Sequence, residues 1–278
     1  MPMKHSLAII FPMNWPVAFL LFLCLLLATP AGAGYDEGMA AHSRGDYAAA
    51  LREWRPLAEE GNADAQYNLA YMYENAQGVP LNHAEAMKWY SRAVGQGHTR
   101  AQVNLGVIYG NGQGLRQDHA TAVWWYGKAA EQGDAFAEYN LGQMYRMGKG
   151  VPQDSAEAYK WYRKAALQGL VVAQYNLAVI YRLGKGVPQD YAAAMKWYSI
   201  AAERGHVKAQ SALGFMYDDG KAVTRNDVEA HKWYNIAATN GDEPARKSRK
   251  ILAKKMTPAN IAKARKLSRD WAAKYAGK

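Results

Sequence analysis

A tryptophan returns every 36 residues along this chain, and most of its neighbours return with it. The repeated tryptophans are Trp89, Trp125, Trp161, Trp197 and Trp233, and a tyrosine follows each of them directly. Leucine, tyrosine and glycine recur in the same register at other positions. A fixed period between about 20 and 50 residues is typical of a solenoid, in which each unit buries its apolar face only against its neighbours. The period therefore predicts a long repeated surface rather than one central active site.

One unit, residues 137–169, reads as two helices in a row. Its first half places Leu141 and Tyr145 at a four-residue step within a run of similar steps, which is typical of one face of a helix. The Gly-Lys-Gly run at 148–150 is expected to end that helix, because glycine adopts the left-handed conformation at little cost. A second helix follows and is expected to end at Gly169.

The start of the second helix has its own signal. Asp154 is expected to cap the helix with its side chain, and Glu157 three residues later predicts a reciprocal capping box. The same signal recurs at Asn82 with Glu85 and at Asn226 with Glu229. No strand pattern interrupts these units. Pairs of antiparallel helices joined by glycine-proline loops therefore predict an all-α fold.

Two kinds of repeated position are assigned to the structure and not to function. The five tryptophans, together with the tyrosine columns, are expected to form the structural core of the repeats, filling the wedges between helix pairs. An asparagine column stands beside the invariant leucine and consists of Asn68, Asn104, Asn140 and Asn176. These amides are expected to bond to the adjacent loop, since buried polar groups are usually satisfied locally. A polar binding ladder is the alternative.

The patterns A-x-x-x-L-G-x-x-Y, G-x-G-V-P-x-D and A-x-x-W-Y-x-x-A-A-x-x-G follow one another in the unit at 137–169, and the other units repeat them with substitutions. This order resembles the Sel1-like repeat, a relative of the tetratricopeptide repeat. The resemblance implies a right-handed α-α solenoid of about five repeats over residues 61–241. Capping helices are expected at 34–60 and, with a strongly basic composition, at 242–278. The last copy departs from the pattern, with Ala222 and Thr224 in place of the loop glycine and proline.

The first 33 residues predict a secretory signal peptide. An apolar run at 17–28 is followed by small residues that end at Ala33, the expected cleavage site. An uncleaved anchor is the alternative, but a spanning helix needs about 20 apolar residues. Pro12 and Pro16 interrupt the only stretch of that length. The sequence therefore predicts a periplasmic or secreted protein.

Sequence motifs typical of catalytic and metal-binding sites are largely missing. Cys24, the single cysteine, lies in the signal segment, so the mature chain has no disulfide, thiolate metal site or cysteine nucleophile. The histidines show no H-x-x-x-H spacing, and no G-x-S-x-G or S-x-x-K motif occurs. We therefore expect no catalytic residue, no metal and no cofactor. An enzyme that acts on the cell wall or on β-lactams is the alternative, because some cysteine-rich proteins with similar repeats have been described in those terms.

The variable positions of the first helix are the candidate binding site. Residues two before and two after the invariant leucine, and those one turn further on, share a side of that helix. In related solenoids this side lines the concave groove. The predicted site residues on this side are Tyr67, Tyr71, Tyr139, Gln143, Arg146, Tyr175, Arg182 and Phe215. Tyrosine and arginine often anchor interfaces, and an exposed apolar stripe often marks a partner site. Burial of this stripe by neighbouring units is the alternative.

The excess of basic residues that gives the net charge of +10 is concentrated at the C-terminal end of the chain. Residues 245–278 contain twelve lysines and arginines against Asp270 alone. These charges are interpreted as the solvated face of a capping helix or as a contact with an anionic membrane or cell-wall surface. Nucleic acid would need the same charges, but export argues against it.

Together these patterns predict an exported, monomeric scaffold or adaptor for an unidentified envelope protein or peptide. The alternatives are the hydrolase described above and an envelope tether that acts through the basic tail.

Overall fold

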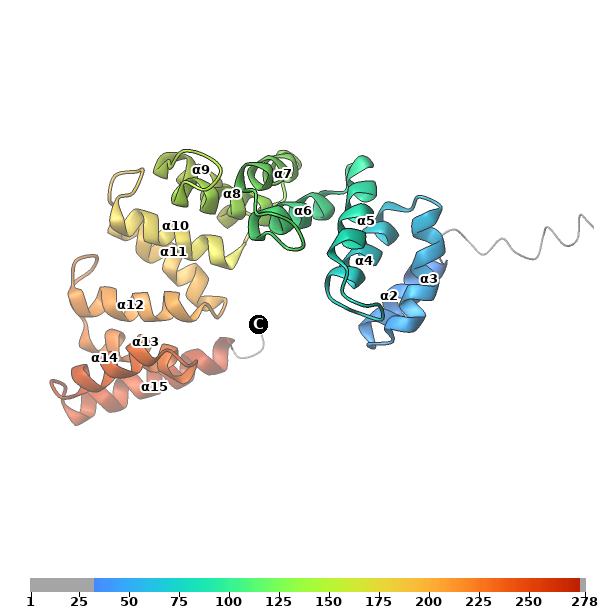
Figure 1. Ribbon diagram of the computed structural model, residues 1–278. Helices are drawn as coiled ribbons and strands as arrows, with labels where there is room; N and C mark the ends of the chain where they lie inside the picture. The colour runs from blue at the N-terminus through green and yellow to red at the C-terminus, as the bar shows by residue number, and fades with distance from the viewer. Residues whose placement is uncertain (1–32, 276–278) are drawn as a thin grey trace, which may run out of the picture. The chain divides into compact units, whose positions relative to one another are not determined.

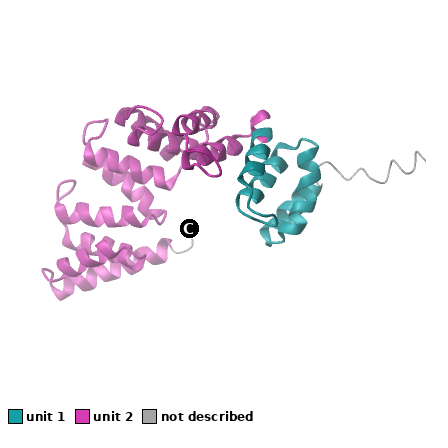
Figure 2. Ribbon diagram, in the orientation of Figure 1, with its two compact units in different colours: residues 1–92 teal, residues 93–278 magenta. Residues whose placement is uncertain are grey.

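The computed structural model describes residues 33–275, and within that range it contains fourteen α-helices and no strand. The prediction of an all-α solenoid built from two-helix repeats is confirmed. Apart from Ala33, the predicted signal peptide lies outside the described residues, so its assignment stays a prediction. The chain divides into two compact units, residues 1–92 and 93–278 (Figure 2).

Helix pairs follow one another through each unit (Figure 1). Unit 1 holds α2 (Ala33–Ser43), α3 (Tyr47–Glu59), α4 (Ala63–Glu74) and most of α5 (His83–Gly95). Unit 2 holds α6 (Thr99–Asn111), α7 (His119–Glu131), α8 (Ala135–Met147), α9 (Ser155–Leu167), α10 (Val171–Leu183), α11 (Tyr191–Glu203), α12 (Val207–Asp219), α13 (Asp227–Thr239), α14 (Glu243–Ala253) and α15 (Pro258–Tyr275). From α7 to α14, each helix of unit 2 packs against the next in chain order.

A backbone hydrogen bond present in each of the five repeats closes the loop between the two helices of the repeat. The cap residue of the second helix donates its N–H to the carbonyl of the tyrosine nine residues earlier, for example Asp154 to Tyr145 at 3.0 Å. The same bond joins Asn82 to Tyr73, Asp118 to Tyr109, Asp190 to Tyr181 and Asn226 to Tyr217. The predicted reciprocal capping box is therefore wrong, because the cap N–H is already engaged. Asp154 caps alone, accepting from the Ala156 and Glu157 amides.

Glycine ends the first helix as expected in the last four repeats, whereas Asn75 is the C-cap of α4. Gly112, Gly148, Gly184 and Gly220 are the C-caps of α6, α8, α10 and α12, each with φ between 66° and 72°. The second loop glycine is lost in the last copy, where Ala222 is not among the described residues with positive φ. The loop is nevertheless closed there by Gly220 at one end and Asn226 at the other.

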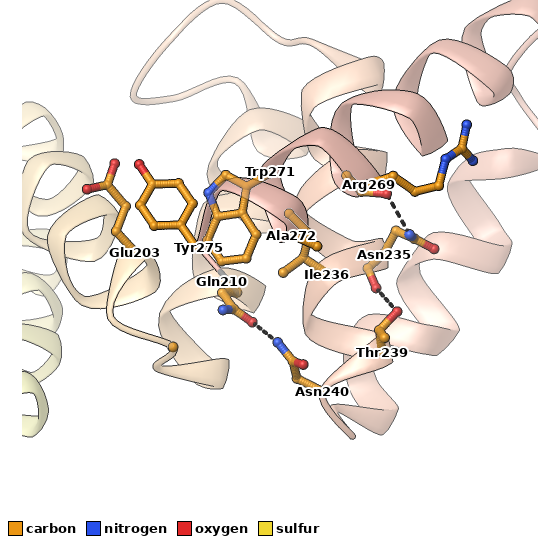
Figure 3. A pocket seen from close by; sticks show the side chains of 12 residues that line it. Glu203, Gln210, Asn235, Ile236, Thr239, Asn240, Arg269, Trp271, Ala272 and Tyr275 are labelled. Carbon is orange, nitrogen blue, oxygen red and sulfur yellow. Dashed lines mark hydrogen bonds between the residues drawn. The ribbon is translucent and has the colours of Figure 1, made fainter. Parts of the chain in front are cut away.

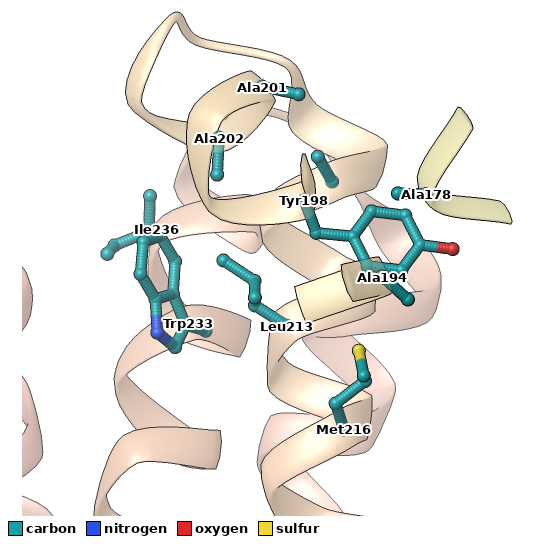
Figure 4. Packing of buried hydrophobic residues seen from close by; sticks show 10 residues of the cluster. Ala178, Ala194, Tyr198, Ala201, Ala202, Leu213, Met216, Trp233 and Ile236 are labelled. Atoms are coloured by element: carbon teal, nitrogen blue, oxygen red, sulfur yellow. The ribbon is translucent and has the colours of Figure 1, made fainter. Parts of the chain in front are cut away.

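The most deeply buried aromatic column is the tyrosine that follows each repeated tryptophan. Tyr90, Tyr126, Tyr162, Tyr198 and Tyr234 are at most 6% exposed. Figure 4 shows Tyr198 among small and aliphatic side chains of one cluster, with Trp233 and Ile236 on another side of Leu213. Among the tryptophans, Trp89 and Trp233 are buried, whereas Trp125, Trp161 and Trp197 are half-buried. The small alanines around these rings allow the helices to approach closely.

The buried polar column is formed by glutamine and glutamate, not by the asparagines. Its members are Gln66, Gln102, Glu138, Gln174 and Gln210. Three of the glutamine amides donate to a carbonyl of the preceding helix, as Gln210 does to Ala202 at 3.2 Å. The prediction that the asparagines bond to the adjacent loop is wrong for two of them, since Asn176 donates to Val172 of its own helix and Asn68 to the Tyr35 hydroxyl.

The basic end of the chain folds as two helices that cover α13. Leu252 of α14 and Ala264 of α15 are buried, and the Trp271 ring lies 5.5 Å from that of Trp233. Arg249 donates to Asn235 of α13, so part of the basic charge has a structural partner. Across residues 33–275 no helix combines the length and the apolar character needed to cross a membrane.

Candidate functional site

One repeat position changes its chemistry along the chain while its surroundings stay the same. It is the last or next-to-last residue of the first helix, and its occupants are Glu74, Gly110, Arg146, Arg182 and Asp218. Sixteen residues later comes the buried tyrosine of the second helix. The acidic occupant Glu74 accepts from the Tyr90 hydroxyl at 2.6 Å. The two arginines instead donate to the tyrosine hydroxyl, and they alone bring positive charge to this position.

The first arginine lies in a cavity of about 520 Å³ between consecutive repeats. Arg146 donates through Nε to the Tyr162 hydroxyl at 3.3 Å, and Gln143 Oε1 accepts from both groups. Val179 and Ile180 of α10 contribute the apolar wall of the cavity, and Lys185 adds a second cation. The cavity therefore combines an oriented guanidinium with an apolar surface.

The second arginine lies in the equivalent place one repeat further on. Arg182 donates through Nε to the Tyr198 hydroxyl at 3.2 Å and lines a cavity of about 440 Å³. Phe215 occupies the position of Val179 and is 48% exposed. It also lines a smaller cavity of about 90 Å³, whose wall includes Tyr191. The larger phenylalanine thus divides the space that is a single cavity in the preceding repeat.

The cations of these cavities have no carboxylate partner. Arg146, Lys185, Arg182 and Lys208 do not occur in any ion pair of the part of the chain that the structure describes. Among the described residues, Asp242 is the one carboxylate that lines either of the two larger cavities. Its oxygen already accepts from the Ala245 amide as the N-cap of α14.

The tyrosine hydroxyls do not neutralise the arginines either. Burial raises the pKa of Tyr162 to about 12, an effect that the hydrogen bond from Arg146 only partly opposes. Burial likewise raises the pKa of Tyr198. Both phenols therefore stay neutral at physiological pH and orient the guanidinium groups as hydrogen-bond partners. The positive charge of each arginine is left available to a ligand.

The structure distributes the predicted site residues over both units. Arg146, Tyr175, Arg182 and Phe215 line the two cavities. Tyr139 and Gln143 stand beside Arg146, since Gln143 donates to the Tyr139 hydroxyl at 2.8 Å. Tyr67 and Tyr71 belong to unit 1, where the Tyr67 ring lies 5.8 Å from that of Tyr90 and Tyr71 is 36% exposed.

Several lining residues were missed by the sequence reasoning. They are Tyr162, Lys185, Tyr198 and Lys208, while Asn176 was considered only as a member of the asparagine column. The two tyrosines were hidden because they belong to an invariant column, which was assigned to the core as a whole. Comparing the five occupants of the arginine position with the tyrosine 16 residues later would have indicated the pairing.

His206 connects the second cavity to a helix cap. Its ring stacks on Tyr175 at 4.5 Å, and its Nδ1 accepts from the Ala209 amide at 3.2 Å, which caps α12. Burial, assisted by the nearby Lys208, lowers the pKa of His206. The neutral ring, with Nδ1 unprotonated, is therefore the form that the cap contact requires.

This lowered pKa predicts an acid-sensitive stability. The unfolded chain takes up the His206 proton near pH 6.5, whereas the folded chain resists it until lower pH. The contribution of His206 to stability is therefore present above about pH 6.5 and is lost as the pH falls through the folded pKa. In urea unfolding between pH 7.5 and pH 5, we expect wild type to lose more stability than His206→Asn. Asparagine keeps the cap acceptor without titrating, as Asn62 does in α4. Equal losses in both proteins would contradict the assignment.

A further cavity of about 370 Å³ lies beneath α15 (Figure 3). Its aromatic wall is formed by Trp271 and Tyr275, whose rings are 4.9 Å apart. The amides that line it bond to one another, as Asn240 does to Gln210 at 2.9 Å, and Arg269 points away from the aromatic pair. Because its polar groups are largely satisfied by the chain itself, this cavity offers less to a ligand than the two arginine cavities.

The repeats match a known family model. The model of the Sel1 repeat matches five consecutive segments, residues 63–98, 99–134, 135–170, 171–206 and 207–242. The chain belongs to the Sel1 repeat family. Its repeats form a helical scaffold, and both arginine cavities lie within the matched range. No match was found among curated proteins.

Solved structures with the same fold include two with substantial identity. A protective antigen present in uropathogenic Escherichia coli strains, which displays an SLR fold, is 40% identical, with a TM-score of 0.73. The match covers 81% of this chain but 48% of the other, so this chain spans about half the length of that protein. A Sel1 repeat protein from Oxalobacter formigenes is 32% identical over 84% of this chain and 98% of its own, also with a TM-score of 0.73.

Proposed function

We propose that this Sel1 repeat chain is a scaffold that binds a protein or peptide in the two arginine cavities of unit 2. The observation that carries the proposal is the recurrence of one arrangement at an interval of one repeat. Each copy contains an arginine without a carboxylate partner, a neutral tyrosine hydroxyl and an apolar wall from the next repeat. A partner that crosses both copies gains two similar contacts at once.

The preorganised conformation of the repeats supports the same function. Each helix pair is held by a capped loop and by a buried tyrosine, so the side chains of the cavities are presented by regular helices. A preorganised surface loses less conformational entropy on binding than a mobile one. Arginine and tyrosine are also the residue types that most often dominate the binding energy of an interface.

The proposal includes export and excludes a separate role for the basic tail. Export rests on the apolar segment and small residues at the start of the sequence. In the tail, Leu252 and Ala264 pack inward, and Arg249 bonds to α13. These contacts support a cap for the last repeat. We assign no reaction, because the chemistry of the cavities is that of holding a ligand.

Photo-crosslinking from Phe215 tests the proposal in the cells that make the protein. Phe215→p-benzoylphenylalanine places the reactive ketone at an exposed position that lines both the larger and the smaller cavity of its repeat. We expect a discrete adduct whose mass identifies the partner. A probe at Ile251, which is 60% exposed on α14, is the matched control outside the cavities. No adduct from Phe215, or the same adduct from both sites, would refute a partner held in the cavities.

A further inference from the structure

The position that Arg146 and Arg182 occupy is positively charged in two neighbouring repeats only, among the five repeats described. Arg146 and Arg182 are preceded by Gly110, which has no side chain to offer, and followed by Asp218. Asp218 lies 3.5 Å from Arg225, so it has a cation of its own. Within unit 2, an arginine without a carboxylate partner therefore contacts the buried tyrosine in two successive repeats. The repeat before them and the repeat after them have no such arginine.

Each of the two guanidinium groups has terminal nitrogens available to bind an anion. The tyrosine hydroxyl accepts from Nε of each guanidinium, at 3.3 Å for Arg146 and 3.2 Å for Arg182. Gln143 Oε1 also accepts from Nε and Nη2 of Arg146, at 3.0 and 2.9 Å. No protein acceptor is recorded among residues 33–275 for either terminal nitrogen of Arg182 or for Nη1 of Arg146. Lys185 and Lys208 add one further cation to each cavity. Oriented guanidinium groups bind carboxylates with charge-assisted hydrogen bonds.

From this arrangement we infer that the ligand is an extended acidic peptide segment, with one carboxylate in each arginine cavity and apolar residues against Val179 and Phe215. The inference deepens the proposed function and rests on it. Complementary charge sets the partner class, since a basic or neutral segment brings no counter-ion to four cations that face, among the described lining residues, the one carboxylate of Asp242.

The repeat also sets the spacing of the two carboxylates. Packed helices lie about 8–10 Å apart, so equivalent positions two helices further on are separated by about 10–20 Å. An extended chain advances about 3.3 Å per residue. The two acidic residues of the ligand are therefore about three to six positions apart. Wider or closer pairs reach only one arginine at a time.

Fluorescence anisotropy with synthetic peptides tests both parts of the inference. The probes are fluorescein-labelled 16-residue peptides with two glutamates at separations of one, four or ten positions on a neutral, partly apolar background. A Gln-Gln peptide and a Lys-Lys peptide at a separation of four are the sequence controls. With the purified protein we expect the Glu-Glu peptide at a separation of four to bind about tenfold or more tightly than the other peptides.

Charge reversal in the protein supplies the second arm. Arg146→Glu/Arg182→Glu is expected to lose the preferred Glu-Glu peptide and to gain the Lys-Lys peptide. Lys247→Glu/Lys250→Glu makes the same change of net charge on exposed residues of α14 and is expected to behave as wild type. Circular dichroism of each variant checks that the helices are intact. Retained Glu-Glu binding in the arginine variant, or equal loss in the lysine variant, would overturn the inference.

The outcomes separate this inference from the proposed function. An adduct from Phe215 together with peptides that bind regardless of their charge or spacing rejects the acidic ligand and keeps the scaffold. An absent adduct together with absent peptide binding rejects both. A spacing preference at one or ten positions overturns the two-cavity geometry.

Discussion

Replacing Tyr162 with alanine is expected to lower the free energy of unfolding by about 3–5 kcal/mol, because it empties the best-packed aromatic position of its repeat. Tyr162 is 0% exposed, and its hydroxyl bonds to Gln143 and Arg146. The loss is measured as the shift of the urea unfolding curve followed by circular dichroism at constant pH.

Two matched variants identify the source of that loss. Tyr162→Phe keeps the ring and removes only the hydroxyl, so about 1 kcal/mol of destabilisation is expected. Trp161→Ala removes the neighbouring ring, which is half-buried, and a loss of about 1–2 kcal/mol is expected. A larger loss from Trp161→Ala than from Tyr162→Ala would mean that the tryptophan column contributes more to the core than the tyrosine column does.

Replacing Gly150 with alanine is expected to destabilise the protein by about 2–5 kcal/mol through backbone strain and overlap together. Gly150 has a φ of +71°, and a Cβ atom there would lie 2.3 Å from the carbonyl oxygen of His119 in the preceding repeat. Neither the backbone nor the start of α7 can move away without disturbing the contact between repeats. Thermal or urea unfolding of the purified variant measures the effect.

Gly133→Ala is the control for strain without overlap. Gly133 has a similar φ of +82°, but a Cβ atom added there would have no other atom within 4 Å. A loss of about 1–2 kcal/mol is expected from the left-handed conformation alone. If the two alanine variants were equally stable, the close approach of the 148–150 loop to α7 would have no energetic weight.

The candidate site was only partly predictable from the sequence. Arg146, Arg182 and Phe215 were found because helical geometry places them on one side of the first helix. Their partners Tyr162 and Tyr198 come from the other helix of the pair, and their role depends on which atoms reach the cavity. The hydroxyl points to the arginine while the ring is buried. A pattern that sorts whole residues into core or surface cannot separate the two ends of one side chain.

The sequence by itself determined the repeat, its two helices and the residues at which they begin and end. Those features depend on short-range physics, namely the left-handed glycine at positions such as Gly148 and the side-chain cap at positions such as Asp154. Only the tertiary structure decided which columns are buried and where the cavities open. Burial depends on how consecutive repeats pack. The tyrosine is therefore buried in all five repeats but the tryptophan only at Trp89 and Trp233, and Val179 or Phe215 closes a cavity begun by the preceding repeat.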